Sequence, residues 1–219
     1  MTLQWIRQGS GRRLTVFFLG WGTDANALGG FDPEADDLLA VYDYTTLSAD
    51  GLARAMAGYP SVRVAAWSMG VAAADELMPL TGTGVEAAVA IGGTATPIDA
   101  RLGIDPAMVE GTCRGWCDAT RRKFDMRMAG GRAALAAAQR LMSARSTADT
   151  QAELAAIIAR RHTPSGFGWT RAIVGGADAI FAPANQLRSW QLASVPVRIV
   201  DAMPHLPFGF IGTAGELFG

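Results

Sequence analysis

The sequence predicts an α/β fold in which a mostly parallel sheet carries helices on both faces. Two observations lead to this prediction. Short apolar runs rich in β-branched and aromatic residues alternate with alanine-rich helical segments, and most of these runs are apolar throughout rather than alternating with polar residues. Strands of that composition are buried on both faces, which is typical of parallel sheets covered by helices. The expected strands cover residues 14–19, 38–44, 62–66, 87–91, 171–174 and 197–200.

Glycines mark the ends of several of these strands. The first strand ends at Gly20, the fourth at Gly92-Gly93 and the fifth at Gly175-Gly176, while the third leads into Ala66-Trp67-Ser68-Met69-Gly70. In parallel sheets the functional groups collect just beyond the carboxyl ends of the strands. Candidate catalytic residues are therefore expected at these strand ends.

Length and composition limit the function classes. The chain has 219 residues, of which 50% are apolar and 18% charged, with a formal net charge of −1. This balance predicts one compact domain over residues 1–219 and excludes a disordered chain, while giving no support to nucleic-acid binding. No run approaches the ~18 apolar residues that span a bilayer, and the N-terminus lacks a secretory pattern, so we expect no membrane partner and a cytoplasmic location.

No cofactor or metal is expected. Gly92-Gly93-Thr94 lacks the lysine and hydroxyl residue of a phosphate-binding loop. Cys113 and Cys117 have no histidine nearby, which makes a poor zinc site.

Residues from about 100 to 163 interrupt the alternation and are expected to form a helical cap over the site, with a strong helix at 131–142. Positive charge is concentrated there, either as a solvated helix face or as a landing site for an acidic partner. The basic residues between Gly111 and Arg145 are Arg114, Arg121, Arg122, Lys123, Arg127, Arg132, Arg140 and Arg145, against Asp118 and Asp125.

Ser68 stands on the turn between the third strand and the next helical segment, with Ala66 two residues before it and Gly70 two residues after. A serine on a tight strand-to-helix turn with small flanking residues is the nucleophile elbow of α/β-hydrolases. The first small residue is Ala66 where that motif has glycine. Ser68 is the predicted nucleophile.

A serine nucleophile needs a base, and the chain has two histidines. His205 follows the sixth strand, where the topology places catalytic groups, whereas His162 lies in Arg160-Arg161-His162, at an end of the cap that we expect to be exposed. His205 is the predicted base.

The acid that orients this histidine is predicted to be Asp178, which follows the fifth strand after two glycines. Asp201 is the alternative, although it lies four residues before His205 on the same loop. The chain order Ser68, Asp178, His205 is that of the α/β-hydrolases.

An oxyanion hole requires two backbone N–H groups. Met69 follows the nucleophile at the start of a helix, and Trp21 lies between Gly20 and Gly22 after the first strand. We expect the backbone N–H groups of Trp21 and Met69 to form it.

With these residues in place, nearly the whole chain resembles the BioG family of pimeloyl-acyl-carrier-protein methyl ester esterases. The resemblance is carried by Phe17-Phe18-Leu19-Gly20-Trp21-Gly22, Tyr42-Asp43-Tyr44, Ala66-Trp67-Ser68-Met69-Gly70-Val71, Gly93-Thr94 before Pro97-Ile98-Asp99, Asp178-Ala179-Ile180-Phe181, Asn185-Gln186 before Trp190, and Pro204-His205-Leu206-Pro207-Phe208.

The resemblance implies a cytoplasmic enzyme of biotin synthesis. Such an enzyme removes the methyl group from pimeloyl-acyl-carrier-protein methyl ester with a triad that maps to Ser68, Asp178 and His205. It also gives the basic cap a partner, since carrier proteins are acidic, and the candidate docking residues are Arg121, Arg122 and Arg127.

Two other functions share parts of this pattern. A broad small-ester esterase or a hydrolase-fold lyase would use the same triad without a protein partner. A catalytically silent binding protein of the same fold would not need the triad at all.

Overall fold

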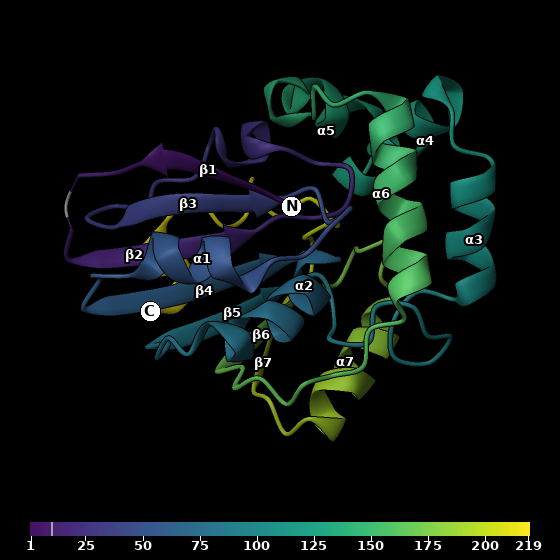
Figure 1. Ribbon diagram of the computed structural model, residues 1–219. Helices are drawn as coiled ribbons and strands as arrows, with labels where there is room; N and C mark the ends of the chain where they lie inside the picture. The colour runs from purple at the N-terminus through teal and green to yellow at the C-terminus, as the bar shows by residue number, and fades with distance from the viewer. Residues whose placement is uncertain (10) are drawn as a thin grey trace.

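The computed structural model describes residues 1–9 and 11–219, in which seven strands form one sheet of order β1-β3-β2-β4-β5-β6-β7. Neighbouring strands are parallel except for the pair β1 and β3 (Figure 1). The strands are β1 (Thr2–Arg7), β2 (Arg13–Phe18), β3 (Asp37–Tyr42), β4 (Ser61–Trp67), β5 (Ala87–Ile91), β6 (Arg171–Gly175) and β7 (Val197–Val200). The architecture is that of an α/β-hydrolase, as the sequence predicts.

Strands β2 to β7 are the six that the apolar runs predict, whereas β1 is a further strand. It lies at the edge of the sheet and reads Thr-Leu-Gln-Trp-Ile-Arg, with only partly buried or exposed side chains. An edge strand of this kind is too polar to be recognised as an apolar run.

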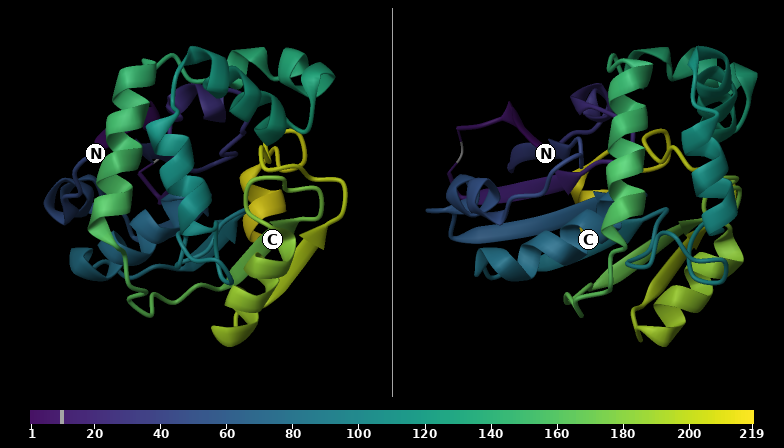
Figure 2. Two further views of the ribbon diagram at one scale, coloured as in Figure 1. Left: turned by 90° about the vertical axis from the view of Figure 1, so that its right-hand side faces the viewer. Right: turned by 45° about the vertical axis from the view of Figure 1, so that its right-hand side comes forward.

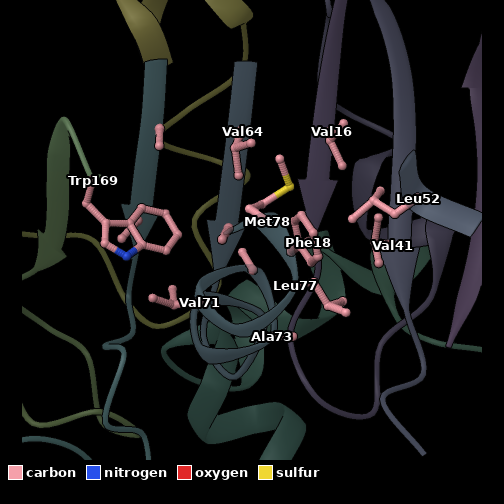
Figure 3. Close-up of a cluster of buried hydrophobic side chains, with 14 of the residues drawn as sticks. Val16, Phe18, Val41, Leu52, Val64, Val71, Ala73, Leu77, Met78 and Trp169 are labelled. Atoms are coloured by element: carbon pink, nitrogen blue, oxygen red, sulfur yellow. The ribbon is translucent and has the colours of Figure 1, made fainter. Parts of the chain in front are cut away.

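The alternation of side chains along each strand divides the core into two layers. Leu14, Val16 and Phe18 of β2 face α1 (Ala49–Met56) and α2 (Gly70–Leu77), and Figure 3 shows this layer. The same layer includes residues of α7 (Pro183–Leu192) and of the 3-10 helix η2 (Met78–Thr81). The opposite layer contains Phe17 and Leu19 and is covered by η1 (Ala25–Leu28) and α8 (Ala214–Phe218). The sheet is therefore covered on both faces.

The chain between β5 and β6 forms a group of helices beyond the carboxyl ends of the parallel strands (Figures 1 and 2). These helices, called the cap below, are α3 (Pro106–Arg114), α4 (Asp118–Ala129), α5 (Arg132–Ala137), η3 (Gln139–Leu141) and α6 (Thr147–Arg160). Within the described residues none of the helices has the length and apolar character needed to span a bilayer. The division into one hydrolase domain with a cap insertion stays a prediction.

The helix expected at 131–142 is shorter than predicted. It ends at Ala137, and the chain continues as the short 3-10 turn η3. The turn brings Leu141 and Met142 against the core layer that η1 covers, which alanine-rich helix propensity does not anticipate.

Candidate active site

Ser68 occupies a strained turn at the end of β4. Its backbone φ is 60°, in the left-handed region that non-glycine residues rarely adopt. The turn lies so close to β2 that a Cβ atom on Gly70 would stand 2.4 Å from the Leu19 carbonyl oxygen, which explains the need for glycine there. Gly93 is equally confined, because a Cβ atom would stand 2.3 Å from the Ser68 carbonyl oxygen. The surrounding chain thus fixes the position of Ser68.

His205 reaches Ser68 from the loop after β7. Its Nε2 atom lies 2.9 Å from Ser68 Oγ, and its side chain is 2% exposed. Phe181 stacks on the imidazole with ring planes 9° apart, and the Trp67 indole N–H donates a hydrogen bond to the His205 carbonyl oxygen. These contacts hold both the ring and the backbone of His205 against the serine.

Asp178 completes a line of hydrogen bonds. Its Oδ2 atom lies 2.9 Å from His205 Nδ1 and accepts a second hydrogen bond from Gln186 Nε2. Its Oδ1 atom accepts hydrogen bonds from the backbone N–H groups of Ile180 and Phe181. Both carboxylate oxygens are therefore held in place by hydrogen bonds, and Oδ2 faces the imidazole.

Asp201 and Gln186 differ in their contacts with the site. Asp201, the alternative acid, is exposed, and its carboxylate makes no hydrogen bond to any described residue. Gln186 does not directly follow a strand, so the topology does not predict a role for it, although the Asn185-Gln186 pair belongs to the family resemblance. Its contact with Asp178 comes from the first two turns of α7.

The arrangement can activate the serine and stabilise an oxyanion. Trp21 and Met69 line the pocket that contains Ser68. Within the described part of the chain the backbone N–H groups of Trp21 and Met69 donate to no protein acceptor. Met69 is also the N-cap of α2, where the helix dipole favours negative charge.

The pocket around Ser68 is largely apolar and is built from both the sheet and the cap. Trp21 packs against Trp116 and Phe124 of the cap with ring centroids 4.6 and 5.3 Å apart. The apolar residues that line the Ser68 pocket are Trp21, Trp67, Met69, Ile104, Met108, Val109, Phe124, Met128, Leu154, Ala179 and Ile180. The walls around Ser68 are therefore apolar apart from the side chains of Ser68, Thr112, Arg127 and His205.

His162 is not at an exposed end of the cap, so that expectation is wrong. Its side chain is 9% exposed and lies 3.2 Å from Asp75 and 3.4 Å from Glu76. Burial alone would raise the pKa of Asp75, but hydrogen bonds from His162, Ser165 and other groups hold that pKa below its ordinary value. His162 thus ties the end of α6 to α2, at a place distinct from Ser68.

The three candidate docking arginines lie in different environments. Arg121 donates hydrogen bonds to the carbonyl oxygens of Ser143 and Arg145, so its guanidinium is used inside the cap. Arg122 and Arg127 are exposed, and Arg127 also lines the Ser68 pocket. The Arg121 side chain turns toward the loop before α6, and docking of a carrier protein by the three arginines stays a prediction.

Cysteine and acidic residues form no evident metal centre. No three His, Cys, Asp or Glu side chains gather to bind a metal ion anywhere in residues 1–9 and 11–219. Cys113 and Cys117 are free thiols.

The chain resembles several known proteins. The crystal structure of BioG from Haemophilus influenzae superposes with a TM-score of 0.90 at 32% identity, covering all of both chains. A malonyl-[acyl-carrier protein] O-methyltransferase of Bacteroides fragilis is 38% identical over 179 residues, which are 80% of this chain but only 36% of that protein. A lipase-esterase related protein from Clostridium acetobutylicum superposes with a TM-score of 0.68 at 12% identity, covering 94% of this chain and 93% of that one, and shares the fold.

The family match extends over nearly the whole chain. Residues 1–211 match the family described as pimeloyl-ACP methyl esterase BioG. This match includes every residue of the Ser68 site and of the cap, and it agrees with the hydrolase fold. The chain belongs to the BioG family of ester hydrolases.

Proposed function

We propose that the protein is a serine esterase of biotin synthesis that hydrolyses the methyl ester of pimeloyl-acyl-carrier-protein methyl ester. The observation that carries the proposal is the line of hydrogen bonds from Asp178 through His205 to Ser68, in a member of the BioG family. The biotin pathway and the pimeloyl substrate come from the family, and the residue roles come from the geometry.

The first half of the reaction forms an acyl-enzyme. Ser68 Oγ attacks the ester carbonyl carbon while its proton passes to His205 Nε2, and Asp178 stabilises the imidazolium. The negative oxygen accepts hydrogen bonds from the N–H groups of Trp21 and Met69. The bond between the carbonyl carbon and the methoxy oxygen then breaks, and His205 gives its proton to that oxygen, so methanol leaves.

The second half releases the acid. His205 takes a proton from a water molecule, whose oxygen attacks the acyl carbon of the ester on Ser68. When the tetrahedral intermediate collapses, the bond to Ser68 Oγ breaks and the oxygen regains its proton from His205. The products are the free pimeloyl carboxylate, still attached to its carrier, and the unchanged enzyme.

The apolar pocket supports an acyl chain with its ester at Ser68. A second groove, lined by Lys123, Met126 and Gly130 of α4 and its end, lies beside this pocket. The residues that line both are Met108, Thr112, Phe124, Arg127 and Ala179. The acyl chain and its linker to the carrier protein would extend from Ser68 along this groove. An acidic carrier would then meet the basic side chains of α4.

The partner proposal rests mainly on the exposed side chains of Arg122, Lys123 and Arg127, because the Arg121 guanidinium already donates hydrogen bonds within the cap. The Bacteroides fragilis relative supports a carrier-linked substrate, because it is named as a malonyl-[acyl-carrier protein] O-methyltransferase. An esterase of this kind would hydrolyse the methyl ester of such a carrier-bound acid.

The test compares two substrates with the purified protein. Pimeloyl-acyl-carrier-protein methyl ester should be hydrolysed with a much higher kcat/KM than a short free methyl ester, as followed by intact mass of the carrier. Equal kcat/KM values would favour the broad small-ester esterase. Turnover of neither ester would favour the lyase or the binding protein.

A further inference from the structure

A carboxylate outside the Ser68 site is completely buried at the junction of cap and sheet. Glu153 lies on α6 with 0% exposed surface. Its Oε2 atom accepts a hydrogen bond from the backbone N–H of Gly22 at 3.1 Å, and its Oε1 atom accepts one from the backbone N–H of Tyr44 at 2.9 Å. One cap side chain therefore holds the loops that follow two adjacent strands, β2 and β3.

These two loops also brace each other. The Tyr44 hydroxyl donates a hydrogen bond of 2.6 Å to the Leu19 carbonyl oxygen, immediately before the glycine that precedes Trp21. Glu153 thus fixes the residue after Trp21 directly and supports the start of the same loop through Tyr44. The peptide N–H of Trp21 lies between these two points of attachment.

A second contact from α6 holds the side chain of Trp21. Its indole N–H donates a hydrogen bond of 2.7 Å to the carbonyl oxygen of Thr150, one turn before Glu153. Thr150 Oγ1 in turn accepts a hydrogen bond from the indole N–H of Trp116 on the cap. The same turn of α6 therefore positions both the side chain of Trp21 and the backbone that follows it.

Arg145 compensates the buried charge of Glu153. Its Nη1 atom lies 2.5 Å from Glu153 Oε2, and its Nη2 atom lies 3.1 Å from Asp43 Oδ1. Burial raises the pKa of Glu153, while Arg145 and the two backbone N–H groups act in the opposite direction. A buried pair of this kind is weak evidence for added stability. The pair of Glu153 and Arg145 matters instead for the geometry that it imposes on the loops at Gly22 and Tyr44.

We infer that Glu153, held by Arg145, is a positioning residue for the oxyanion hole, because it fixes the loop that presents the Trp21 N–H toward Ser68. The inference rests on the proposed ester hydrolysis at Ser68. It means that the cap helps to form the catalytic site as well as covering it, since the loop is attached to α6. A donor that must stay within about 0.5 Å of its productive position, roughly 3 Å from the developing oxyanion, needs such a rigid attachment.

The test is the Glu153→Gln variant. Glutamine has nearly the same volume but replaces one acceptor oxygen by an NH₂ group, so Gly22 N–H or Tyr44 N–H loses its acceptor. On a short free methyl ester we expect kcat to fall by about tenfold or more with KM unchanged, because loss of a whole oxyanion donor costs about 10² to 10³ in kcat. A trifluoromethyl ketone, which forms a charged tetrahedral adduct with the serine, should lose affinity by the same factor as kcat/KM falls.

Two further variants make the result decisive. Glu110→Gln removes an exposed cap carboxylate that pairs only with exposed Arg114, and it should change neither kcat nor inhibitor affinity. If Glu153→Gln does not fold, Arg145→Lys keeps the positive charge but loses the forked contact, and it should show the same paired losses to a smaller degree.

A folded Glu153→Gln protein with wild-type kcat would overturn the inference. A fall in kcat without the matching loss of inhibitor affinity would also overturn it, since a general structural defect does not act selectively on the charged adduct. If the Glu153→Gln protein does not fold, a folded Arg145→Lys protein without the paired losses would overturn it as well.

Ser68→Ala is measured in parallel. Activity in that variant would contradict the proposed function itself, whereas its inactivity beside an unaffected Glu153→Gln protein would reject the positioning role alone.

Discussion

The Nε2 atom of His205 and the Oγ atom of Ser68 lie 2.9 Å apart, although 137 positions separate the two residues in the chain. The contact exists because β4 and β7 belong to the same sheet and the loops at their carboxyl ends lie on the same edge. Asp178, after β6, joins them from the intervening part of that edge. The site is therefore a product of the sheet topology, and substitutions at its three residues should affect chemistry far more than folding.

The two histidines should behave differently. His205→Ala is expected to abolish ester hydrolysis, because no other described group accepts the Ser68 proton. His162→Ala should keep kcat on a short ester and lower the midpoint of thermal unfolding, because His162 pairs with Asp75 and Glu76. Steady-state kinetics and thermal unfolding of both variants check this. Equal losses of kcat in His205→Ala and His162→Ala would contradict the assignment of His205 alone as the base.

Asp178→Asn should lower kcat by about 10⁴, as loss of the carboxylate does in other serine triads. Asp201→Asn is the matched control, since it makes the same chemical change at an exposed carboxylate on the loop that carries His205. Its kcat should stay close to that of the wild type. The opposite ranking in the same assay would transfer the role of the acid to Asp201.

Reversing charge at Arg122 and Lys123 should raise KM for the carrier-bound ester and leave kcat on a short free ester unchanged. Both side chains are exposed on α4, and electrostatic attraction acts on encounter rather than on acyl transfer. Added salt should have the same selective effect on the wild type, because it screens charges over about 8 Å at physiological ionic strength.

Arg54→Glu provides the matched control for this experiment, since Arg54 is exposed on α1 in the hydrolase core. It should leave both reactions unchanged. If salt and the cap substitutions fail to alter the carrier-bound reaction, the basic surface of α4 is not the docking site.

Asp36 should make folding stability depend on pH. It is 1% exposed, and burial alone would raise its pKa, but hydrogen bonds from Arg63, Arg13 and Thr15 hold that pKa below its ordinary value. Its contribution to the free energy of unfolding is then fully present above the ordinary aspartate pKa of about 3.9 and is lost as pH falls through the lower folded value.

Urea unfolding of wild type and Asp36→Asn over about pH 2 to 7 measures this contribution. The difference in the free energy of unfolding should be largest near neutral pH and should shrink below about pH 4. A difference that stays constant over the whole range would mean that the charge of Asp36 contributes nothing.

The sequence predicts the parts of the site that follow from strand ends. Ser68, Asp178 and His205 each stand just beyond an apolar strand, and a parallel sheet brings such positions together. Glu153 carries no comparable signal, because a glutamate in an alanine-rich helix is usually exposed. Its burial depends on Gly22 and Tyr44, more than a hundred positions away in the chain.

Side-chain direction is the other property that the sequence pattern does not determine. Arg121, Arg122 and Lys123 form one basic run, yet Arg121 turns inward to the carbonyl oxygens of residues 143 and 145. The direction of the Arg121 side chain depends on the position of the loop before α6. The position of that loop depends in turn on the end of α5 at Ala137, whereas helix propensity predicts a helix that continues to residue 142.

Covalent labelling tests the central claim most directly. The wild-type protein is incubated with a fluorophosphonate, and the modified residue is identified by mass spectrometry of its peptides, with Ser68→Ala and His205→Ala treated in parallel. The account predicts rapid, stoichiometric modification of Ser68, no modification of the Ser68→Ala protein, and very slow modification of the His205→Ala protein. Labelling at another residue, or hydrolysis of pimeloyl-acyl-carrier-protein methyl ester by Ser68→Ala at the wild-type rate, would contradict it.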